Sequence, residues 1–336
     1  MTTDRLSFAT EAGLSLPSDG RILLLGAPGD LVTEALPLER CAVVQRFRPD
    51  FDLWQRRGVE VSLVPEGSFT AAVVFLPRAR ELAEARIAEA CAAVPDGLIV
   101  VDGLKTDGIE ALVKALKSRT ELQGQVSKAH GKTVWFTATD VFADWARAPD
   151  LNAHGDWTAP GVFSADGPDP ASQALLAALP AKLGAQVADL GAGWGGLSTG
   201  LLSRDSLAAL HLVEADRTAL DCAERNVTDP RASFHWADAT SWEPPALLDT
   251  VVMNPPFHTG RKADPALGQA FIAAARRMLK PAGQLWLVAN RHLPYETALA
   301  THFRAVRLAL EVPADAPQLR VGASSEVTID LQSSVQ

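Results

Sequence analysis

The tetrapeptide Asn254-Pro255-Pro256-Phe257 is the part of the sequence whose residue types point most directly to chemistry. It follows the apolar run 250–253, which is typical of a buried strand. Each proline fixes φ and removes a backbone donor, so the turn after this strand should be stiff. We expect the turn to hold two acceptors, the Asn254 carboxamide and the Pro255 carbonyl, beside the Phe257 ring. That set suits a planar exocyclic amine, which would donate both N–H groups while its ring stacks on the aromatic face.

Such a turn favours one kind of reaction. An amine conjugated with a heteroaromatic ring is a poor nucleophile, and holding it as it pyramidalises favours attack on an electrophilic methyl group. Stabilising that geometry more than the ground state is what catalysis requires. The motif alone serves a guanine N2 amine, an adenine N6 amine or a protein glutamine amide equally well. The alternative without chemistry is an ordinary Pro-Pro turn after a strand.

A glycine-rich run, Gly191–Gly196, lies between a predicted strand at 186–190 and a helical stretch from Leu197. Glycines there let the backbone approach a ligand and place it at a helix N-terminus. The run fits both G-x-G-x-G and the dinucleotide pattern G-x-G-x-x-G, so it does not name a cofactor. A second predicted strand, 211–213, ends in Glu214, where an acid can bind ribose hydroxyls.

Two further acids favour S-adenosylmethionine over a nicotinamide dinucleotide. Asp189 comes just before the glycine turn, where a carboxylate can face a cationic amino group and would repel a pyrophosphate. Asp238 follows a third strand and can accept from an adenine amino group, although Asp is also a favoured helix N-cap. Asp189, Glu214, Asp238 and Asn254 all fall at the C-terminal ends of predicted strands. Ligands of open α/β sheets bind along that edge.

At these residues the sequence resembles a class I S-adenosylmethionine-dependent methyltransferase. Longer segments are similar to one family, the ribosomal RNA small-subunit methyltransferase C family, and the resemblance is strongest over about residues 155–300. These segments are Gly161-Val-Phe-Ser164 with Asp166 and Asp169, Asn254-Pro-Pro-Phe-His-Thr-Gly260, and Leu287-Val-Ala-Asn-Arg-His-Leu-Pro-Tyr295. The final stretch, Pro313 to Gln336, fits the family's ending poorly.

The resemblance implies a fold, a cofactor and a substrate. It implies methyl transfer from S-adenosylmethionine to the exocyclic N2 of a guanine in 16S ribosomal RNA, with the 30S subunit as the partner. Asn254, Pro255, Pro256 and Phe257 would hold the guanine. The implied cofactor-binding residues are Asp189, Gly191, Ala192, Gly193, Glu214, Asp238, Ala239 and Asn254.

The first half of the sequence repeats the segment order of the second, and we interpret it as a duplicate that has lost its chemistry. The segment 21–29 aligns with 186–194, and 72–77 aligns with 250–255. Apolar or neutral side chains stand where the second half has its proposed ligand residues, so they cannot bind the same groups. The replacements are Leu24 for Asp189, Pro28 for Gly193, Gln45 for Glu214 and Leu76 for Asn254.

The predicted fold class is therefore α/β, with two tandem Rossmann-like domains built on doubly wound, mostly parallel sheets. Residues 1–150 form the degenerate copy, which we expect to aid folding or RNA docking. Residues 151–336 form the catalytic domain. A Pro/Gly/Asp-rich stretch over 148–160 connects them.

Composition limits the remaining possibilities. A chain of 336 residues accommodates two α/β domains, and its content of 47% hydrophobic and 21% charged residues is typical of a soluble globular protein. Cys41, Cys91 and Cys222 are scattered, without metal-ligand spacing, so neither a disulfide framework nor a metal site is expected. No apolar run approaches the roughly 20 residues that span a bilayer. We expect a cytoplasmic enzyme with no membrane partner.

The net charge of −9 argues against indiscriminate binding to nucleic acid, which depends on neutralising phosphates with Lys and Arg. Acidic residues outnumber basic ones in both halves, so any RNA site must be a local patch. The candidates are His258, Arg261, Lys262, Arg291 and His292, which are otherwise an ordinary solvated rim.

Two other classes of protein stay open at this stage. A non-catalytic RNA-binding assembly factor would keep the fold, but it should then have lost its site residues, as the first half has. A nicotinamide oxidoreductase would use the glycine run, but Asn254-Pro-Pro-Phe has no part in that chemistry.

Overall fold

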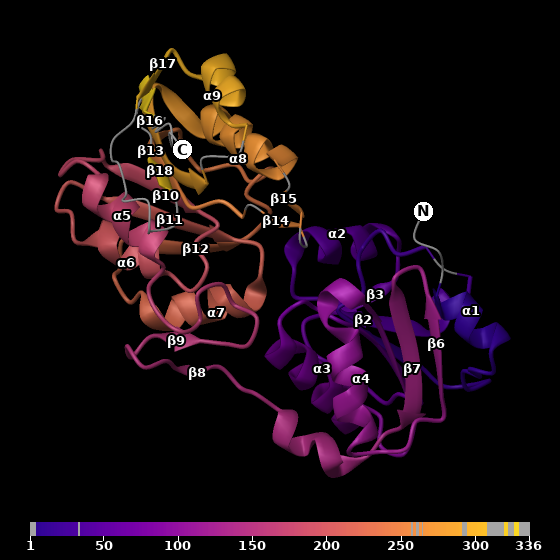
Figure 1. Ribbon diagram of the computed structural model, residues 1–336. Helices are drawn as coiled ribbons and strands as arrows, with labels where there is room; N and C mark the ends of the chain where they lie inside the picture. The colour runs from indigo at the N-terminus through magenta and orange to yellow at the C-terminus, as the bar shows by residue number, and fades with distance from the viewer. Residues whose placement is uncertain are drawn as a thin grey trace, which may run out of the picture. The chain divides into compact units, whose positions relative to one another are not determined.

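The computed structural model describes residues 5–32, 34–256, 258–259, 262–263, 265–290, 294–307, 319–321 and 326–328. The chain divides into two compact units, each described below by itself (Figure 1). Unit 1 consists of Met1–Pro149 with Ala159–Gly161, and unit 2 consists of Asp150–Thr158 with Val162–Gln336.

Unit 1 is built on one seven-stranded sheet in the order β3-β2-β1-β4-β5-β7-β6. The first five strands in this order run parallel, and β7 is antiparallel to both β5 and β6. The strands are β1 (Ile22–Leu25), β2 (Cys41–Val44), β3 (Glu60–Ser62), β4 (Ala71–Phe75), β5 (Leu98–Leu104), β6 (Gly124–Lys128) and β7 (Gly131–Thr137).

Helices cover both faces of this sheet. They are α1 (Arg5–Glu11), α2 (Arg48–Arg56), α3 (Arg80–Ala93) and α4 (Ile109–Lys117), with short 3₁₀ segments η1 (Leu38–Arg40), η2 (Lys105–Asp107) and η3 (Asp140–Trp145). Alternate residues of β1 enter opposite cores, Leu23 packing with α3 and α4, and Leu24 packing with α1 and α2. Burial on both faces explains why the strands are continuous apolar runs.

Unit 2 repeats this plan in a sheet ordered β12-β11-β10-β13-β16-β18. The first five strands are parallel, and β18 is antiparallel to β16. The strands are β10 (Gln186–Leu190), β11 (Ala209–Glu214), β12 (Ala232–Trp236), β13 (Leu248–Met253), β16 (Leu279–Asn290) and β18 (Leu319–Val321). Three two-stranded ribbons accompany it: β8 (Asp150–Leu151) with β9 (Trp157–Thr158), β14 (His258–Thr259) with β15 (Lys262–Ala263), and β17 (Ala305–Arg307) with β19 (Glu326–Thr328).

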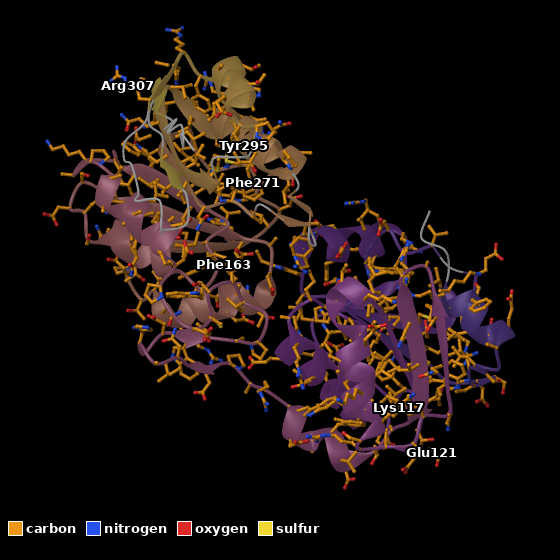
Figure 2. All side chains as sticks on the ribbon, viewed as in Figure 1. Lys117, Glu121, Phe163, Phe271, Tyr295 and Arg307 are labelled. Carbon is orange, nitrogen blue, oxygen red and sulfur yellow. The ribbon has the colours of Figure 1, made fainter. Side chains whose placement is uncertain are left out.

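The helices of unit 2 are α5 (Pro170–Ala178), α6 (Gly196–Leu202), α7 (Arg217–Asn226), α8 (Pro265–Met278) and α9 (Glu296–His302). One core joins α5, α6 and α7 to one face of the sheet, and another joins α8 and α9 to the opposite face. Phe271 of α8 and Tyr295, just before α9, both belong to the second core (Figure 2).

The two sheets share the same order of parallel strands, with β1, β2, β3, β4 and β5 corresponding to β10, β11, β12, β13 and β16. The prediction of two tandem Rossmann-like α/β domains is therefore confirmed. Within the described residues, no helix is long and apolar enough to cross a membrane.

Candidate active site

The glycine-rich loop after β10 leaves open space above its backbone. Gly191 and Gly193 have φ values of +77° and +57°, which L side chains rarely adopt. A Cβ added at Gly193 would meet no atom within 4 Å, and one at Gly191 would meet only Cε1 of Phe271, at 3.8 Å. These glycines are therefore needed for backbone conformation, and the space over them can admit a ligand.

Asp189 is a charged residue in the interior of unit 2. It is fully buried in β10, and its Oδ2 accepts a 2.7 Å hydrogen bond from the Ser198 hydroxyl. Its Oδ1 is also buried and has no hydrogen-bond partner within the part of the chain that the structure describes. The pKa of this carboxyl is raised to about 7, chiefly by burial; the Ser198 bond lowers it and the nearby Glu214 raises it. A buried carboxylate oxygen without a partner destabilises the folded protein unless a hydrogen-bond donor or a cation binds to it.

Glu214, at the end of β11, connects the second strand to the glycine loop. Its Oε2 accepts from the Gly193 N–H and its Oε1 from the Asp216 N–H, both at 2.8 Å. Burial raises the pKa of this carboxyl, while the two N–H groups lower it. Each carboxylate oxygen keeps a second lone pair, so Glu214 can shape the loop and still accept from ligand hydroxyls.

Asp238 follows β12 and caps a turn. Its Oδ1 accepts from the Thr240 N–H at 2.8 Å and from the Thr240 hydroxyl at 2.6 Å. The capping alternative considered from the sequence is thus present, although the cap is on a turn and no α-helix begins there. Oδ2 lies outside these bonds, and the next residue, Ala239, is buried.

Asn254 follows β13, which pairs with β10 so that Met253 lies opposite Leu190. This register brings Asn254 to the same sheet edge as the glycine loop. The Asn254 amide nitrogen donates to Oδ2 of Asp169 and to Oγ of Ser172, each at 3.0 Å. Its Oδ1 therefore points away from this pair.

The remaining residues of the predicted tetrapeptide differ in exposure. Pro255 is buried and Pro256 is exposed, whereas Phe257 lies outside the described residues. The side chains of the predicted basic patch, His258, Arg261, Lys262, Arg291 and His292, also lie outside what the structure describes.

Three side chains that contact the site residues had no role assigned to them from the sequence. Ser198 holds Asp189, while Asp169 and Ser172 hold Asn254. The sequence does signal that a helix begins after Asp169, because a capping residue precedes Pro170 at the first helical position. It contains no signal for a contact between residues 85 positions apart.

The equivalent edge of unit 1 is occupied by the protein's own side chains. Gln45, the counterpart of Glu214, donates from Nε2 to the Ala27 carbonyl at 2.9 Å, and Trp54 donates to the same oxygen at 2.9 Å. A Cβ on Gly26, the counterpart of Gly191, would meet the Arg86 guanidinium at 2.1 Å. Leu24 supplies no charge at the position of Asp189. Unit 1 thus has the loop but neither the open space nor the acids at the ends of the strands, and the carboxylate near its loop, Asp50, is already bound to the Gly29 N–H at 2.9 Å.

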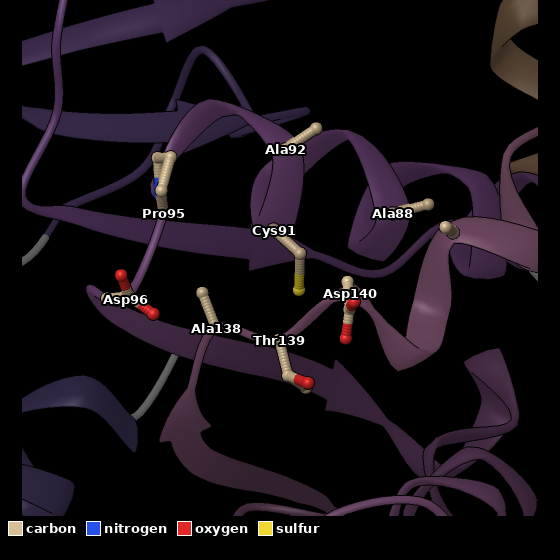
Figure 3. Close-up of a pocket in the computed structure, with 9 residues that line it drawn as sticks. Ala88, Cys91, Ala92, Pro95, Asp96, Ala138, Thr139 and Asp140 are labelled. Atoms are coloured by element: carbon tan, nitrogen blue, oxygen red, sulfur yellow. The ribbon is translucent and has the colours of Figure 1, made fainter.

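Unit 1 also contains a cavity of about 560 Å³, between the C-terminal end of α3 and the start of η3 (Figure 3). Its polar lining includes Cys91, Asp96, Thr139 and Asp140. Burial raises the pKa of the Cys91 thiol, which disfavours the reactive thiolate. Across the described residues, no group of three or more His, Cys, Asp or Glu side chains could hold a metal ion. The acidic edge of unit 2 is therefore the stronger candidate for chemistry.

Comparisons with known proteins show the family to which the chain belongs. The family model described as "Methyltransferase small domain" matches residues 156–313. The chain is 24% identical to a T. thermophilus 16S rRNA N2 methyltransferase solved in complex with AdoMet and guanosine. That likeness has a TM-score of 0.75 and covers 97% of this chain and 92% of the other, which shows the shared fold.

Two curated relatives are called ribosomal RNA small subunit methyltransferase C. The chain is 29% identical to the protein of Hahella chejuensis over 315 residues, 87% of this chain and 91% of the relative. It is 30% identical to the protein of Pseudomonas aeruginosa over 314 residues, 86% of this chain and 91% of the relative. The family resemblance predicted from the motifs is confirmed, and the chain belongs to the ribosomal RNA small subunit methyltransferase C family.

Proposed function

We propose that unit 2 transfers the methyl group of S-adenosylmethionine to the exocyclic N2 amine of a guanine in 16S ribosomal RNA. The observation that carries the proposal is the orientation of Asn254. Its amide nitrogen is bound to Asp169 and Ser172, so its oxygen is directed away as an acceptor at the edge where the glycine loop opens. An acceptor held in this way can orient an amine that must donate two N–H groups.

The residues of the glycine-loop edge fit S-adenosylmethionine. The buried Oδ1 of Asp189 can bind the ammonium group, and the open backbone of Gly191, Ala192 and Gly193 can lie against the ligand. We assign Glu214 to the ribose hydroxyls, and Asp238 with Ala239 to the adenine. When bound, the cofactor would supply a methyl group on a positively charged sulfur: transfer would form an N–C bond as the C–S bond breaks, and the methylated nitrogen would then lose one proton to solvent.

The chain's own contribution is to bind and orient the amine. The Asn254 oxygen and the Pro255 carbonyl would accept hydrogen bonds from its two N–H groups. Pro256 would stiffen the turn, and the Phe257 ring would stack on the base. Holding two reactants in register supplies much of the rate enhancement. The base must leave its stack to reach such a turn, as for other enzymes that modify bases.

We assign catalysis to residues 151–336 and a supporting role, in folding or in docking of the RNA, to residues 1–150. The edge of unit 1, which the protein's own side chains occupy, supports this division. The proposed substrate is ribosomal RNA within the 30S subunit, which places the reaction in the cytoplasm and involves no membrane or metal.

The test is transfer of labelled methyl from S-adenosylmethionine to purified 30S subunits, 50S subunits and free rRNA, followed by nucleoside analysis. We expect label in N2-methylguanosine from the 30S sample. Label in N6-methyladenosine would replace the proposed base, and unlabelled RNA in a sample that binds the cofactor would contradict an RNA substrate. The Asn254→Ala variant separates binding from catalysis, because it should still bind the cofactor and lose most turnover.

A further inference from the structure

We infer that Asp169 and Ser172 are positioning residues, which select the orientation of the Asn254 carboxamide that presents its oxygen to the substrate amine. The inference rests on the proposed function and adds to it the residues that hold the Asn254 amide in the orientation that the substrate amine requires. Neither residue would touch the substrate.

Both residues lie at the start of α5, a nine-residue helix. The helix is anchored by Leu175, which is fully buried in the core shared with α6 and α7. Asp169 is its N-cap, and Oδ2 of Asp169 accepts from the Ser172 N–H at 2.8 Å. The same oxygen accepts from the Asn254 amide nitrogen at 3.0 Å. One carboxylate oxygen therefore links the start of α5 to the end of β13.

The two partners of Asn254 act differently because their chemistry differs. A carboxylate only accepts hydrogen bonds, so reversing the amide would bring Oδ1 of Asn254 to about 3 Å from another acceptor, which is unfavourable. The Ser172 hydroxyl can donate or accept and would tolerate either orientation. Asp169 thus decides which end of the amide faces it, and Ser172 adds a second contact that fixes the position.

The orientation matters because of what the substrate amine offers. An exocyclic amine presents N–H groups, and only the oxygen of Asn254 can accept from them. A reversed amide would present its own N–H₂ group, leaving two donors facing each other. Losing the constraint should therefore lower turnover while leaving the cofactor site, on β10 and β11, unchanged.

The first part of the test compares two substitutions on α5 in the full-length protein. Asp169→Ser keeps a favoured N-cap residue but shortens the side chain, so the contact with Asn254 is lost while the helix keeps its start. Ser172→Ala removes the hydroxyl but leaves the Ser172 N–H in place as the donor to Asp169. Gln173→Ala, at an exposed position of the same helix, is the matched control.

We expect kcat on 30S subunits to fall about 10- to 100-fold in Asp169→Ser, the loss typical of a hydrogen bond to a charged group, and by less in Ser172→Ala. Ser172→Thr, which keeps a hydroxyl, should restore most of the activity. Dissociation constants for S-adenosylmethionine should stay within about twofold of wild type in every variant, because a pure positioning defect acts on the bound amine.

The deciding measurement is a double-mutant cycle with Asn254→Ala. If Asp169 acts through Asn254, adding Asp169→Ser to Asn254→Ala should cause no further loss of kcat. Equal losses in both backgrounds, or an unchanged kcat in Asp169→Ser, would overturn the inference and leave the proposed function standing. Wild-type protein that methylates no guanine would overturn the proposed function, and this inference with it.

Discussion

Gln45 in unit 1 and Glu214 in unit 2 make the same local contact: the Oε1 of each accepts a hydrogen bond from the backbone N–H two residues further along the chain. The other terminal atom of each side chain makes a different contact. Nε2 of Gln45 donates to a loop carbonyl, whereas Oε2 of Glu214 accepts from the Gly193 N–H. The change from carboxylate to amide therefore goes with a loop that turns a carbonyl toward the strand end and has Pro28, which lacks an N–H group, at the position of Gly193.

This relationship predicts that Glu214→Gln will damage the glycine loop of unit 2. With Oε1 kept on Asp216, the new amide nitrogen would face the Gly193 N–H, donor against donor. We expect the affinity for S-adenosylmethionine to fall at least about tenfold, because the partly buried Gly193 N–H would lose its acceptor. Isothermal titration calorimetry measures the affinity. Gln45→Glu is the control in unit 1, and it should lower thermal stability without altering cofactor affinity; an unchanged affinity in Glu214→Gln would show that Oε2 does not shape the loop.

Asp189 predicts a pH dependence of cofactor binding. Because its pKa is raised to about 7 from an ordinary value of 3.8, the folded protein without cofactor binds a proton there that the unfolded chain has lost. The stability of that state should therefore decrease as pH rises from about 4 to 7. Binding a cationic ammonium requires the carboxylate, so affinity for S-adenosylmethionine should increase up to about pH 7 and then level off.

Titration of the cofactor at several pH values tests this expectation. Asp189→Asn should remove the pH dependence together with most of the affinity. Ser198→Ala removes a bond that lowers the pKa of Asp189, so the pH at which affinity levels off should move upward. A profile in wild-type protein that is flat between pH 5 and 8 would show that Asp189 does not titrate on binding.

The buried ion pair of unit 1 predicts a stability effect. Arg5 contacts both carboxylate oxygens of Asp102, at 2.8 and 2.6 Å, and the Thr133 hydroxyl donates to one of them at 2.6 Å. Arg5→Ala should destabilise unit 1 by about 3 kcal/mol, because it leaves a buried carboxylate without its cation. Lys105→Ala, which removes an exposed partner of Glu110, should change stability by less than about 1 kcal/mol. Urea unfolding compares the two variants, and equal effects would contradict the role of burial.

A pair of histidines in unit 2 predicts acid sensitivity. Nδ1 of His211 lies 3.0 Å from Nε2 of His235, and both rings contact the Trp242 ring. Burial lowers the pKa of both imidazoles, and His211 lowers that of His235 further. The neutral forms are thus favoured in the folded state. Their stabilisation is complete above the ordinary histidine pKa of about 6.5 and is lost as pH falls below it.

His235→Gln should reduce that loss, and thermal unfolding between pH 5 and 8 measures it. Titration of Asp189 changes the stability in the opposite direction over part of this pH range, so the comparison is best made in an Asp189→Asn background. Identical pH profiles with and without His235 would show that the pair does not titrate in the folded protein.

Several residues of the candidate site could be predicted from short segments of the sequence, because the residue types at a turn or at a strand end depend on a few neighbours. Glycines with positive φ after a strand, and an acid at the end of the next strand, predicted the edge at which Gly191, Gly193 and Glu214 lie. Asp189 was predicted from its position directly before the turn. The sequence did not show that its Oδ2 would be bound by Ser198, leaving Oδ1 as the atom without a partner.

The sequence by itself determined the two α/β copies, the loss of acids from the first, and the residue types at each strand end, since periodicity and turn chemistry act over a few neighbours. The tertiary structure alone decided which atoms of those residues are available. Asp169 reaches Asn254 because α5 packs on the sheet through Leu175, and the start of that helix then meets the end of β13. Contacts between residues so far apart depend on how helices pack on a sheet, and no local pattern in the sequence encodes that packing.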